Sequence, residues 1–140
     1  MRTVSEIMAS KGTQFNFIDA DASVLEALSV MKCENLSYLI VLQRGKYAGV
    51  FSENDYARKV ILMDKHSGST KVREVMSADL PKISTDDSSS YCMRLMNMHK
   101  TRYMPVFDGF DFKGVITIHD IMREAIAGAA METTGTGVEW

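Results

Sequence analysis

Two pairs of residues in this chain combine a hydroxyl group with a carboxylate three positions later. Ser52 precedes Asp55, and Thr117 precedes Asp120. Each pair follows an apolar run that predicts a strand, and it stands at the start of a predicted helix. The free N–H groups and the dipole of a helix start favour a phosphate, and a carboxylate can accept both hydroxyl groups of a ribose. The pattern is therefore typical of a nucleotide site, and the alternative is that both pairs only cap their helices.

Arginines follow the two aspartates at a matching distance. Arg58 and Arg123 stand three residues after them, close to one helical turn, and are predicted to share the face of the aspartates. A guanidinium group can bind phosphate oxygens with two hydrogen bonds. A third arginine, Arg102, stands where the first half of the chain has Ser37. It is either a further phosphate ligand or a solvated surface group.

These matches belong to an internal duplication. At an offset of 65, residues 21–61 match residues 86–126 at ten of 41 positions, where composition alone predicts roughly two or three. Residues 4–8 (VSEIM) return as residues 72–76 (VREVM) at an offset of 68. Because the offset changes, the first copy is expected to carry a longer loop around residues 11–16. Each copy is too short to be more than marginally stable alone, so we expect both to share a core and pack as one module.

Both copies predict the same order of elements, β-α-β-β-α, and hence an α+β fold. The first helix of each copy begins after an Asp-x-Ser sequence, and a glycine-containing turn joins the next two strands. The predicted ranges are 15–18, 24–34, 38–42, 47–52 and 53–63 in the first copy, and 82–84, 89–99, 104–107, 112–117 and 119–127 in the second.

The ranges divide the chain into two repeats. The first spans residues 3–63, a polar linker spans 64–70, and the second repeat spans 71–127. Residues 128–140 show no apolar period, so they predict a flexible tail unless Trp140 anchors it on a partner.

Composition excludes several classes of function. A net charge of −2, with 46% hydrophobic and 24% charged residues, argues against nucleic-acid binding. No stretch is long enough to span a membrane and no signal peptide is visible, so we expect a cytoplasmic protein. Cys33 and Cys92 are expected to be reduced core thiols. No residues match a catalytic or metal-binding motif, which predicts neither an enzyme, nor a catalytic cofactor, nor a metal site.

The duplicated order of elements, with Gly-Val before each hydroxyl–carboxylate pair, resembles a tandem pair of CBS domains, also called a Bateman module. The SEIM and REVM openings, the Asp-x-Ser helix starts and the run Tyr103-Met104-Pro105-Val106 add to the resemblance. It covers residues 3–127 and is similar to stand-alone bacterial and organellar pair proteins. It implies two repeats related by a pseudo-twofold axis, a homodimer that pairs through helical faces, and an adenine-nucleotide ligand such as AMP, ADP, ATP, NAD(H) or S-adenosylmethionine.

The resemblance also implies strand segments that recognise the base. Backbone groups there can read the adenine edge while apolar side chains cover its faces, although each such residue alone is more often part of a core. The candidates are Phe17, Ile18, Tyr38, Ile40, Ser84, Tyr103 and Pro105. Because the first copy has Ile40 in place of the proline and carries the longer loop, we expect one dominant site. The complete set Ser52, Asp55 and Arg58 slightly favours the first copy.

The leading hypothesis is therefore a regulatory sensor that binds an adenine nucleotide and signals its ligand state to an effector protein by conformational change. The phosphate-seeking arginines favour AMP or NAD(H) as the ligand. The alternative is a structural scaffold that binds a partner and whose nucleotide motifs are idle.

Overall fold

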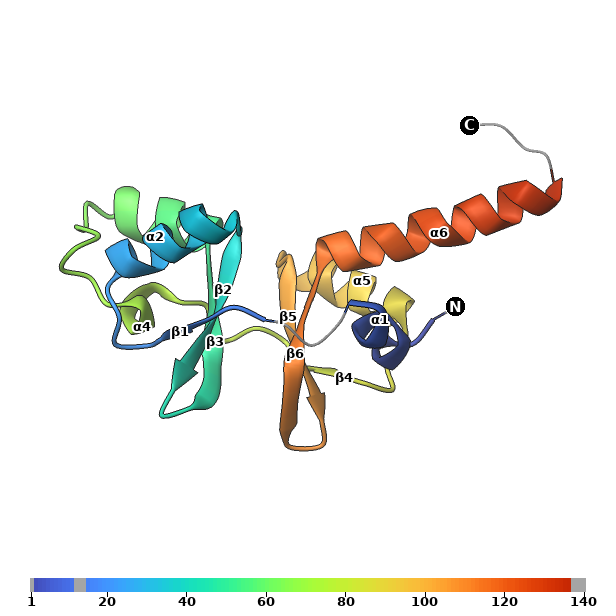
Figure 1. Ribbon diagram of the computed structural model, residues 1–140, viewed down its shortest axis with the longest axis horizontal. Coiled ribbons are helices and arrows are strands. Elements are labelled where there is room, and N and C mark those ends of the chain that lie inside the picture. Colours follow the sequence, from blue (N-terminus) through green and yellow to red (C-terminus); the bar gives the residue numbers. More distant parts are fainter. Residues whose placement is uncertain (1, 12–14, 137–140) are drawn as a thin grey trace. The chain divides into compact units, whose positions relative to one another are not determined.

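The computed structural model describes residues 2–11 and 15–136, with side chains up to residue 127 (Figure 1). Its elements are α1 (Val4–Lys11), β1 (Phe17–Asp19), α2 (Val24–Glu34), β2 (Tyr38–Gln43), β3 (Lys46–Ser52), α3 (Glu53–Asp55), the π-helix η1 (Tyr56–Ile61), α4 (Val72–Val75), β4 (Ile83–Ser84), α5 (Ser89–His99), β5 (Tyr103–Asp108), β6 (Asp111–Thr117) and α6 (Ile118–Thr136). None of the helices in these ranges is both long and apolar enough to cross a membrane.

The described strands form two sheets of the same topology, which confirms the predicted duplicated α+β fold. In the order β1-β2-β3 and β4-β5-β6, the first strand is parallel to the central strand and the third is antiparallel to it. The hairpin between β2 and β3 turns at Arg44 and Gly45, which both have positive φ angles. Two such residues in succession suit the twist of the flanking strands, as the glycine in the predicted turn suggested.

The chain divides into two compact units that differ from the sequence repeats in one element. The first unit contains residues 15–80, and the second unit contains residues 2–11 and 81–136. Helix α1 thus packs with the elements of the second repeat, as Figure 1 shows for the dark-blue helix beside α5 and α6. Helix α4 packs with the elements of the first repeat.

Matching hydrogen bonds fix these two helices in their units. The N–H of Val4 donates to the carbonyl of Asp87 at 2.8 Å, and the N–H of Val72 donates to the carbonyl of Ala22 at 2.9 Å. Val4 and Val72 are equivalent in the openings VSEIM and VREVM, and Asp87 and Ala22 are equivalent at the offset of 65. Each opening helix therefore docks in the same way, but the opening helix of the first repeat docks on the second.

Each unit has its own cluster of buried apolar residues. The first surrounds Leu39, Phe51 and Val60, and the second surrounds Met104 and Ile116, all fully buried. Where the sequence predicts a shared core, the buried residues of the described chain thus form one cluster in each unit. The removal of these side chains from water is the main source of stability for both units.

The predicted helix starts are confirmed. The side chain of Ser23 caps α2 by accepting a hydrogen bond from the N–H of Glu26 at 3.0 Å. Ser88 caps α5 by accepting from the N–H of Tyr91 at 3.2 Å. Serine at these positions satisfies an N–H group that the first turn of a helix otherwise leaves without a partner.

Two predicted boundaries are corrected. Helix α1 continues through Lys11 into the predicted loop 11–16, of which residues 12–14 lie outside the described residues. Helix α6 continues to Thr136, where the sequence predicts an end near Ala127 followed by a tail. An alanine-rich sequence favours helix strongly enough to tolerate the glycines at positions 128 and 135, each of which costs about 1 kcal/mol. Trp140, the predicted anchor, lies outside the described residues.

Proline explains why β4 is shorter than β1. In the first unit the N–H of Ile40 donates to the carbonyl of Asn16 at 2.9 Å, which extends the pairing of β1 with β2. Pro105 occupies the equivalent position in β5 and has no N–H to donate. The pairing of β4 with β5 is accordingly limited to Ile83 and Ser84.

Candidate functional site

The first hydroxyl–carboxylate pair forms a reciprocal cap where β3 passes into α3. The N–H and the hydroxyl of Ser52 donate to Oδ2 of Asp55 at 2.9 and 3.1 Å. The N–H of Asp55 donates back to the hydroxyl oxygen of Ser52 at 3.3 Å. Both residues are buried. The arrangement is a capping box, and it accounts for one of the two carboxylate oxygens.

The second pair repeats this geometry at the junction of β6 and α6. The N–H and the hydroxyl of Thr117 donate to Oδ2 of Asp120 at 2.8 and 3.1 Å, and the N–H of Asp120 donates to the hydroxyl oxygen of Thr117 at 3.2 Å. Both are again buried. Each motif therefore places a rigidly held carboxylate at a helix start.

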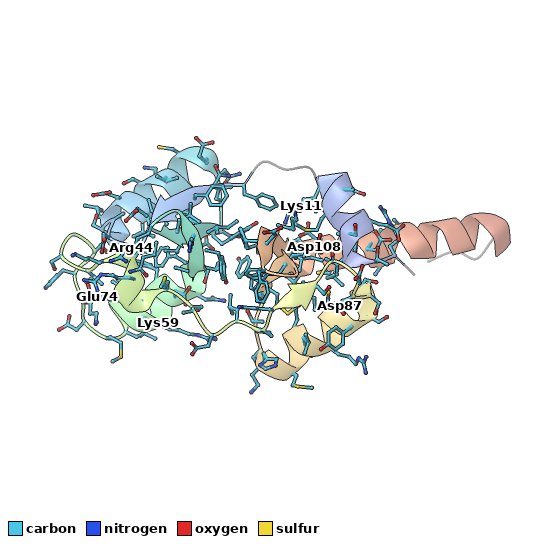
Figure 2. The ribbon with its side chains drawn as sticks, turned by 90° about the horizontal axis from the view of Figure 1, so that it is seen from below. Lys11, Arg44, Lys59, Glu74, Asp87 and Asp108 are labelled. Atoms are coloured by element: carbon cyan, nitrogen blue, oxygen red, sulfur yellow. The ribbon has the colours of Figure 1, made fainter. Side chains whose placement is uncertain are left out.

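Groups from elsewhere in the first unit hold the other carboxylate oxygen of Asp55. The hydroxyl of Ser77 donates to Oδ1 at 2.7 Å, and Nζ of Lys59 lies 3.1 Å from the same atom. The lysine, labelled in Figure 2, also donates to the carbonyl of Met76 at 3.4 Å. Because these partners are side chains, ligand hydroxyl groups can take their place without unfolding the cap.

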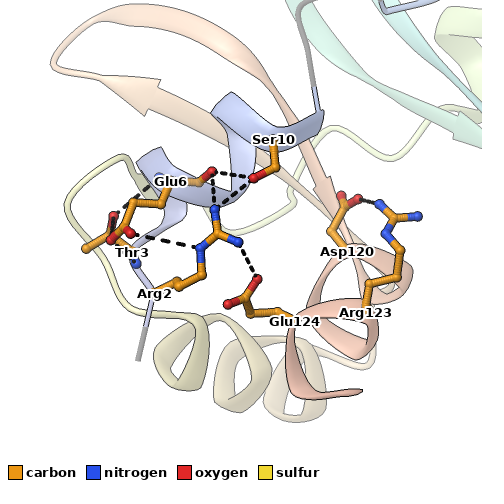
Figure 3. A network of polar contacts seen from close by, with 7 residues as sticks. All are labelled: Arg2, Thr3, Glu6, Ser10, Asp120, Arg123 and Glu124. Carbon is orange, nitrogen blue, oxygen red and sulfur yellow. Dashed lines mark hydrogen bonds and ion pairs between the residues drawn. The ribbon is translucent and has the colours of Figure 1, made fainter. Parts of the chain in front are cut away.

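In the second unit two cations contact Asp120. Arg123 of α6 pairs with Oδ1, as Figure 3 shows. Lys11 of α1 places Nζ 2.8 Å from Oδ2 and also donates to the carbonyl of Val115 at 2.7 Å. The buried carboxylate is thus neutralised by its own helix and by a residue more than 100 positions away.

The structure separates the two arginines that the sequence treats as equivalent. Arg123 contacts its aspartate, whereas Arg58 is exposed and Lys59 takes the pairing role instead. The reason is η1, in which each residue turns the chain through a smaller angle than in an α-helix. Lys59, four positions after Asp55, therefore lies on the same side of the helix as the aspartate, and Arg58 lies on another side.

Sequence reasoning missed Lys59, Ser77 and Lys11. Lys59 carried a usable signal, since oppositely charged residues four apart on a helix commonly pair. Ser77 and Lys11 carried none, because only the packing of α4 and α1 brings them to the carboxylates.

Two of the base-recognition candidates lie beside the caps. Tyr38 is the register partner of Ser52, and Tyr103 is the register partner of Thr117. Both tyrosines are half-buried. Arg102 is next to Tyr103, its side chain is exposed, and its carbonyl accepts a hydrogen bond from the first N–H of α6 at 2.9 Å.

The remaining candidates lie in different surroundings. Ile40 and Pro105 are buried in the central strands β2 and β5. Phe17 is 45% exposed and Ile18 packs against the first cluster. Ser84 is exposed, and its N–H donates to the carboxylate of Asp87 at 2.7 Å. Only the two tyrosines of this group are thus register partners of the caps.

The two cysteines also differ. Cys33 is exposed, contrary to the expected core position, and Cys92 is buried. Burial raises the pKa of the Cys92 thiol to about 12, with a smaller contribution from the carboxylate of Asp87. No group of three or more His, Cys, Asp or Glu residues in the described chain is arranged to hold a metal ion.

Two three-stranded α+β units with duplicated caps define a protein built from a pair of CBS domains. The family model named CBS domain matches residues 4–62 and 72–127, and the chain belongs to this family. Proteins with such pairs are generally regulatory modules that bind ligands, adenine nucleotides among them, and stand-alone pairs are typically not enzymes.

Individual relatives agree with this assignment. The chain is 29% identical to the mitochondrial CBS domain-containing protein CBSX3 of Arabidopsis thaliana, over 89% of its own length and 65% of the relative's. It is 28% identical to the CBS domain-containing protein YhcV of Bacillus subtilis, over 91% of its length and 94% of the relative's. A solved protein with CBS domains from Burkholderia ambifaria is 32% identical, with a TM-score of 0.84 and coverage of 90% of this chain and 95% of that one. One solved protein of similar fold is a hexamer.

Proposed function

We propose that this chain is a regulatory module that binds an adenine nucleotide, with AMP or NAD(H) preferred, and reports its ligand state to an effector protein by conformational change. The observation that carries this proposal is the duplicated cap. Both hydroxyl–carboxylate pairs form the same buried hydrogen-bonded arrangement at the end of a strand and the start of a helix.

A helix cap needs only one carboxylate oxygen, and these sites also place a cation at the other oxygen. Oδ2 of each aspartate serves the cap, while Oδ1 contacts the cation Lys59 in the first unit or Arg123 in the second. Ribose hydroxyl groups can replace a cation at such an oxygen, and the cation can then bind the phosphate. A carboxylate beside a displaceable cation therefore suits the two polar parts of a nucleotide.

The surrounding residues supply the remaining functions of the site. Tyr38 and Tyr103 stand next to the caps in the sheet register and offer apolar cover for a base. Arg58 and Arg102 present exposed guanidinium groups that can bind phosphate oxygens. These cations favour AMP or NAD(H) over S-adenosylmethionine, whose sulfur carries a positive charge.

The site at Asp55 is proposed to be the dominant one. Its Oδ2 atom serves only the cap, whereas Oδ2 of Asp120 also receives a hydrogen bond from Lys11. Each aspartate has two partners outside its cap, but ligand hydroxyl groups face one cation, Lys59, at Asp55 and two cations, Lys11 and Arg123, at Asp120.

A homodimer that pairs through helical surfaces belongs to the same proposal. Large apolar side chains are exposed on or directly after the closing helical segments, namely Ile61, Leu62 and Met63 in the first unit and Met122 and Ile126 in the second. Exposed apolar residues that gather on one element are typical of an interface. Light scattering that gives twice the chain mass at micromolar concentration supports the dimer, and a monomer mass contradicts it.

The test is a thermal-shift titration with AMP, ADP, ATP, NAD⁺, NADH and S-adenosylmethionine. A ligand at about 100 times its Kd adds about 2.7 kcal/mol to the free energy of unfolding and raises the melting temperature by several degrees. The discriminating variants are Asp55→Asn and Asp120→Asn, because the asparagine oxygen can still accept the hydrogen bonds that Ser52 or Thr117 donates in the cap, whereas its NH2 group cannot accept any. Loss of the shift in these variants supports nucleotide binding at the caps.

A structural scaffold is the second candidate, and one observation favours it. Each aspartate already has partners for both oxygens within its own unit. A scaffold predicts no shift with any nucleotide, in protein shown to contain no nucleotide carried over from its source. It also predicts that the two asparagine variants leave every binding property unchanged.

A further inference from the structure

In the second unit the ammonium group of Lys11 contacts Asp120, the carboxylate that would bind the ribose of a nucleotide. Its Nζ lies 2.8 Å from Oδ2 of Asp120 and 2.7 Å from the carbonyl oxygen of Val115. The side chain of Asp120 is 2% exposed and that of Lys11 is 18% exposed. Electrostatic attraction is stronger at such a site than in water, so the lysine is a serious competitor for any hydroxyl donor.

In the first unit the equivalent carbonyl and carboxylate receive their hydrogen bonds from Ser77, and not from a cation of the opening helix. There the N–H of Ser77 donates to the carbonyl of Val50 at 2.8 Å, and its hydroxyl donates to Asp55 at 2.7 Å. Val50 is equivalent to Val115, so Lys11 replaces both of these donors with one ammonium group. The difference arises because α4 ends at Val75 and the chain then pairs with β3, whereas α1 continues to Lys11.

A pocket adjoins this ammonium group between α1 and α6. It has a volume of about 390 Å³ and is lined in part by the cations Arg2, Lys11 and Arg123 and the carboxylates Asp120 and Glu124. The volume lies within the range of about 300–1,000 Å³ that is common for small-molecule sites. Each of these cations is paired with a carboxylate, so an anionic group that enters the pocket would compete with Asp120 for Lys11 and Arg123.

Arg2 also lines the pocket and is already held in place. Its guanidinium group donates to the carbonyl of Glu6 at 3.0 Å, to the hydroxyl of Ser10 at 2.8 Å and to Glu124 at 3.2 Å. Figure 3 shows this network beside the Asp120–Arg123 pair. Lys11 is a second cation of this pocket whose flexible side chain can move, and like Arg123 it contacts Asp120.

We infer that this pocket receives the phosphate of a nucleotide whose ribose is bound by Asp120, and that Lys11 makes the second site selective for phosphorylated ligands. The inference rests on the proposed function. When an anionic nucleotide displaces Lys11 from Asp120, the ammonium group can pair with the phosphate of the nucleotide. A nucleoside without phosphate displaces it and leaves the ammonium group partly buried without an anion, which is costly.

The test compares the affinities for AMP and adenosine by isothermal titration calorimetry. All proteins carry Asp55→Asn, so that only the second site is measured. The variant is Lys11→Met, and the matched control is Lys113→Met, which removes an exposed lysine from β6 of the same unit. The expected result is that Lys11→Met strengthens adenosine binding and weakens AMP binding, so that the ratio of the two affinities falls about tenfold. The control is expected to leave the ratio unchanged.

The possible outcomes separate the two proposals. An unchanged ratio in Lys11→Met overturns the role of Lys11 and leaves nucleotide binding intact. Binding by the unmodified chain but not by the Asp55→Asn background shows that the second site takes no nucleotide, and overturns this inference alone. Absence of binding to the unmodified chain overturns the proposed function itself. If Lys11→Met does not fold, Lys11→Gln keeps a hydrogen-bond-donating NH2 group without the charge and is also expected to lower the ratio.

Discussion

Nζ of Lys59 lies 3.1 Å from Oδ1 of Asp55. In the second unit the residue equivalent to Lys59 is Glu124, which pairs with Arg2, so Arg123 takes the aspartate instead. The cation at each carboxylate therefore depends first on the residue four positions after the aspartate, a lysine in the first unit and a glutamate in the second.

Replacement of Lys59 is expected to affect stability, and replacement of Arg58 is not. Lys59→Met removes a partner of a buried carboxylate and should lower the free energy of unfolding by about 1 kcal/mol, a small value because the lysine is itself partly exposed. Arg58→Met should change it by less than about 0.5 kcal/mol, since the side chain is exposed. Urea denaturation of both variants measures the difference. Equal losses in the two would contradict the pairing.

Gly49 is predicted to tolerate no side chain. A Cβ atom at this position would lie 2.6 Å from the backbone oxygen of Ser77, where the chain after α4 crosses β3. Because a backbone atom cannot move aside cheaply, Gly49→Ala should destabilise the protein by about 1–3 kcal/mol. Gly68 is the control, since a Cβ atom there would have no neighbour within 4 Å.

For Gly68→Ala, the free energy of unfolding should stay within about 0.5 kcal/mol of the original value. Thermal and urea denaturation of both variants provide the measurement. A Gly49→Ala protein as stable as Gly68→Ala would show that the segment around Ser77 does not approach β3 so closely.

The exchange of opening helices can be tested by hydrogen exchange. Ile7 is buried in the second cluster and Val75, its equivalent, is buried in the first. Ile7→Ala is expected to cost about 2–4 kcal/mol and to speed amide exchange mainly in residues 81–127. Val75→Ala should instead speed exchange in residues 15–62. Faster exchange in residues 15–62 after Ile7→Ala would mean that α1 packs with its own repeat.

The two cysteines are expected to react differently. At pH 8 iodoacetamide should modify exposed Cys33 and leave Cys92 unmodified until the protein unfolds, because burial raises the pKa of the Cys92 thiol to about 12 and withholds the reactive thiolate. Mass spectrometry of the alkylated peptides gives the site of modification. Rapid labelling of Cys92 in folded protein would contradict its burial.

The same pKa shift predicts a loss of stability in alkali. Between the ordinary pKa of 9.0 and about 12, the unfolded chain releases the Cys92 proton while the folded chain retains it. The free energy of unfolding should therefore fall as the pH rises through this window. Burial also raises the pKa of Tyr47 from 10.0 to about 12, which adds to the fall above pH 10. Denaturation at pH 8 and pH 10 measures the effect, and Cys92→Ala should show a shallower decline between them.

Much of the local structure could be predicted from the residues alone. The serine caps at Ser23 and Ser88, the strand pairs and their hairpin turns depend on short-range patterns, and the structure has them where the sequence indicates. The reciprocal contact of Ser52 with Asp55 also spans only three residues, so the motif itself contains the partners. Boundaries at Lys11 and Thr136 were less predictable, because helix ends depend on weak propensities.

The sequence by itself determined the duplication, the order of elements and the position of a carboxylate at the start of each closing helix, because periodicity and capping act between near neighbours. Lys59 also lies only four residues from Asp55, so its pairing was within reach of a local pattern. Only the tertiary structure decided that Ser77 meets Asp55 and that Lys11 meets Asp120, because α1 packs in the unit of the second repeat. Contacts between residues distant in the chain depend on how whole elements pack, and no local pattern encodes that choice.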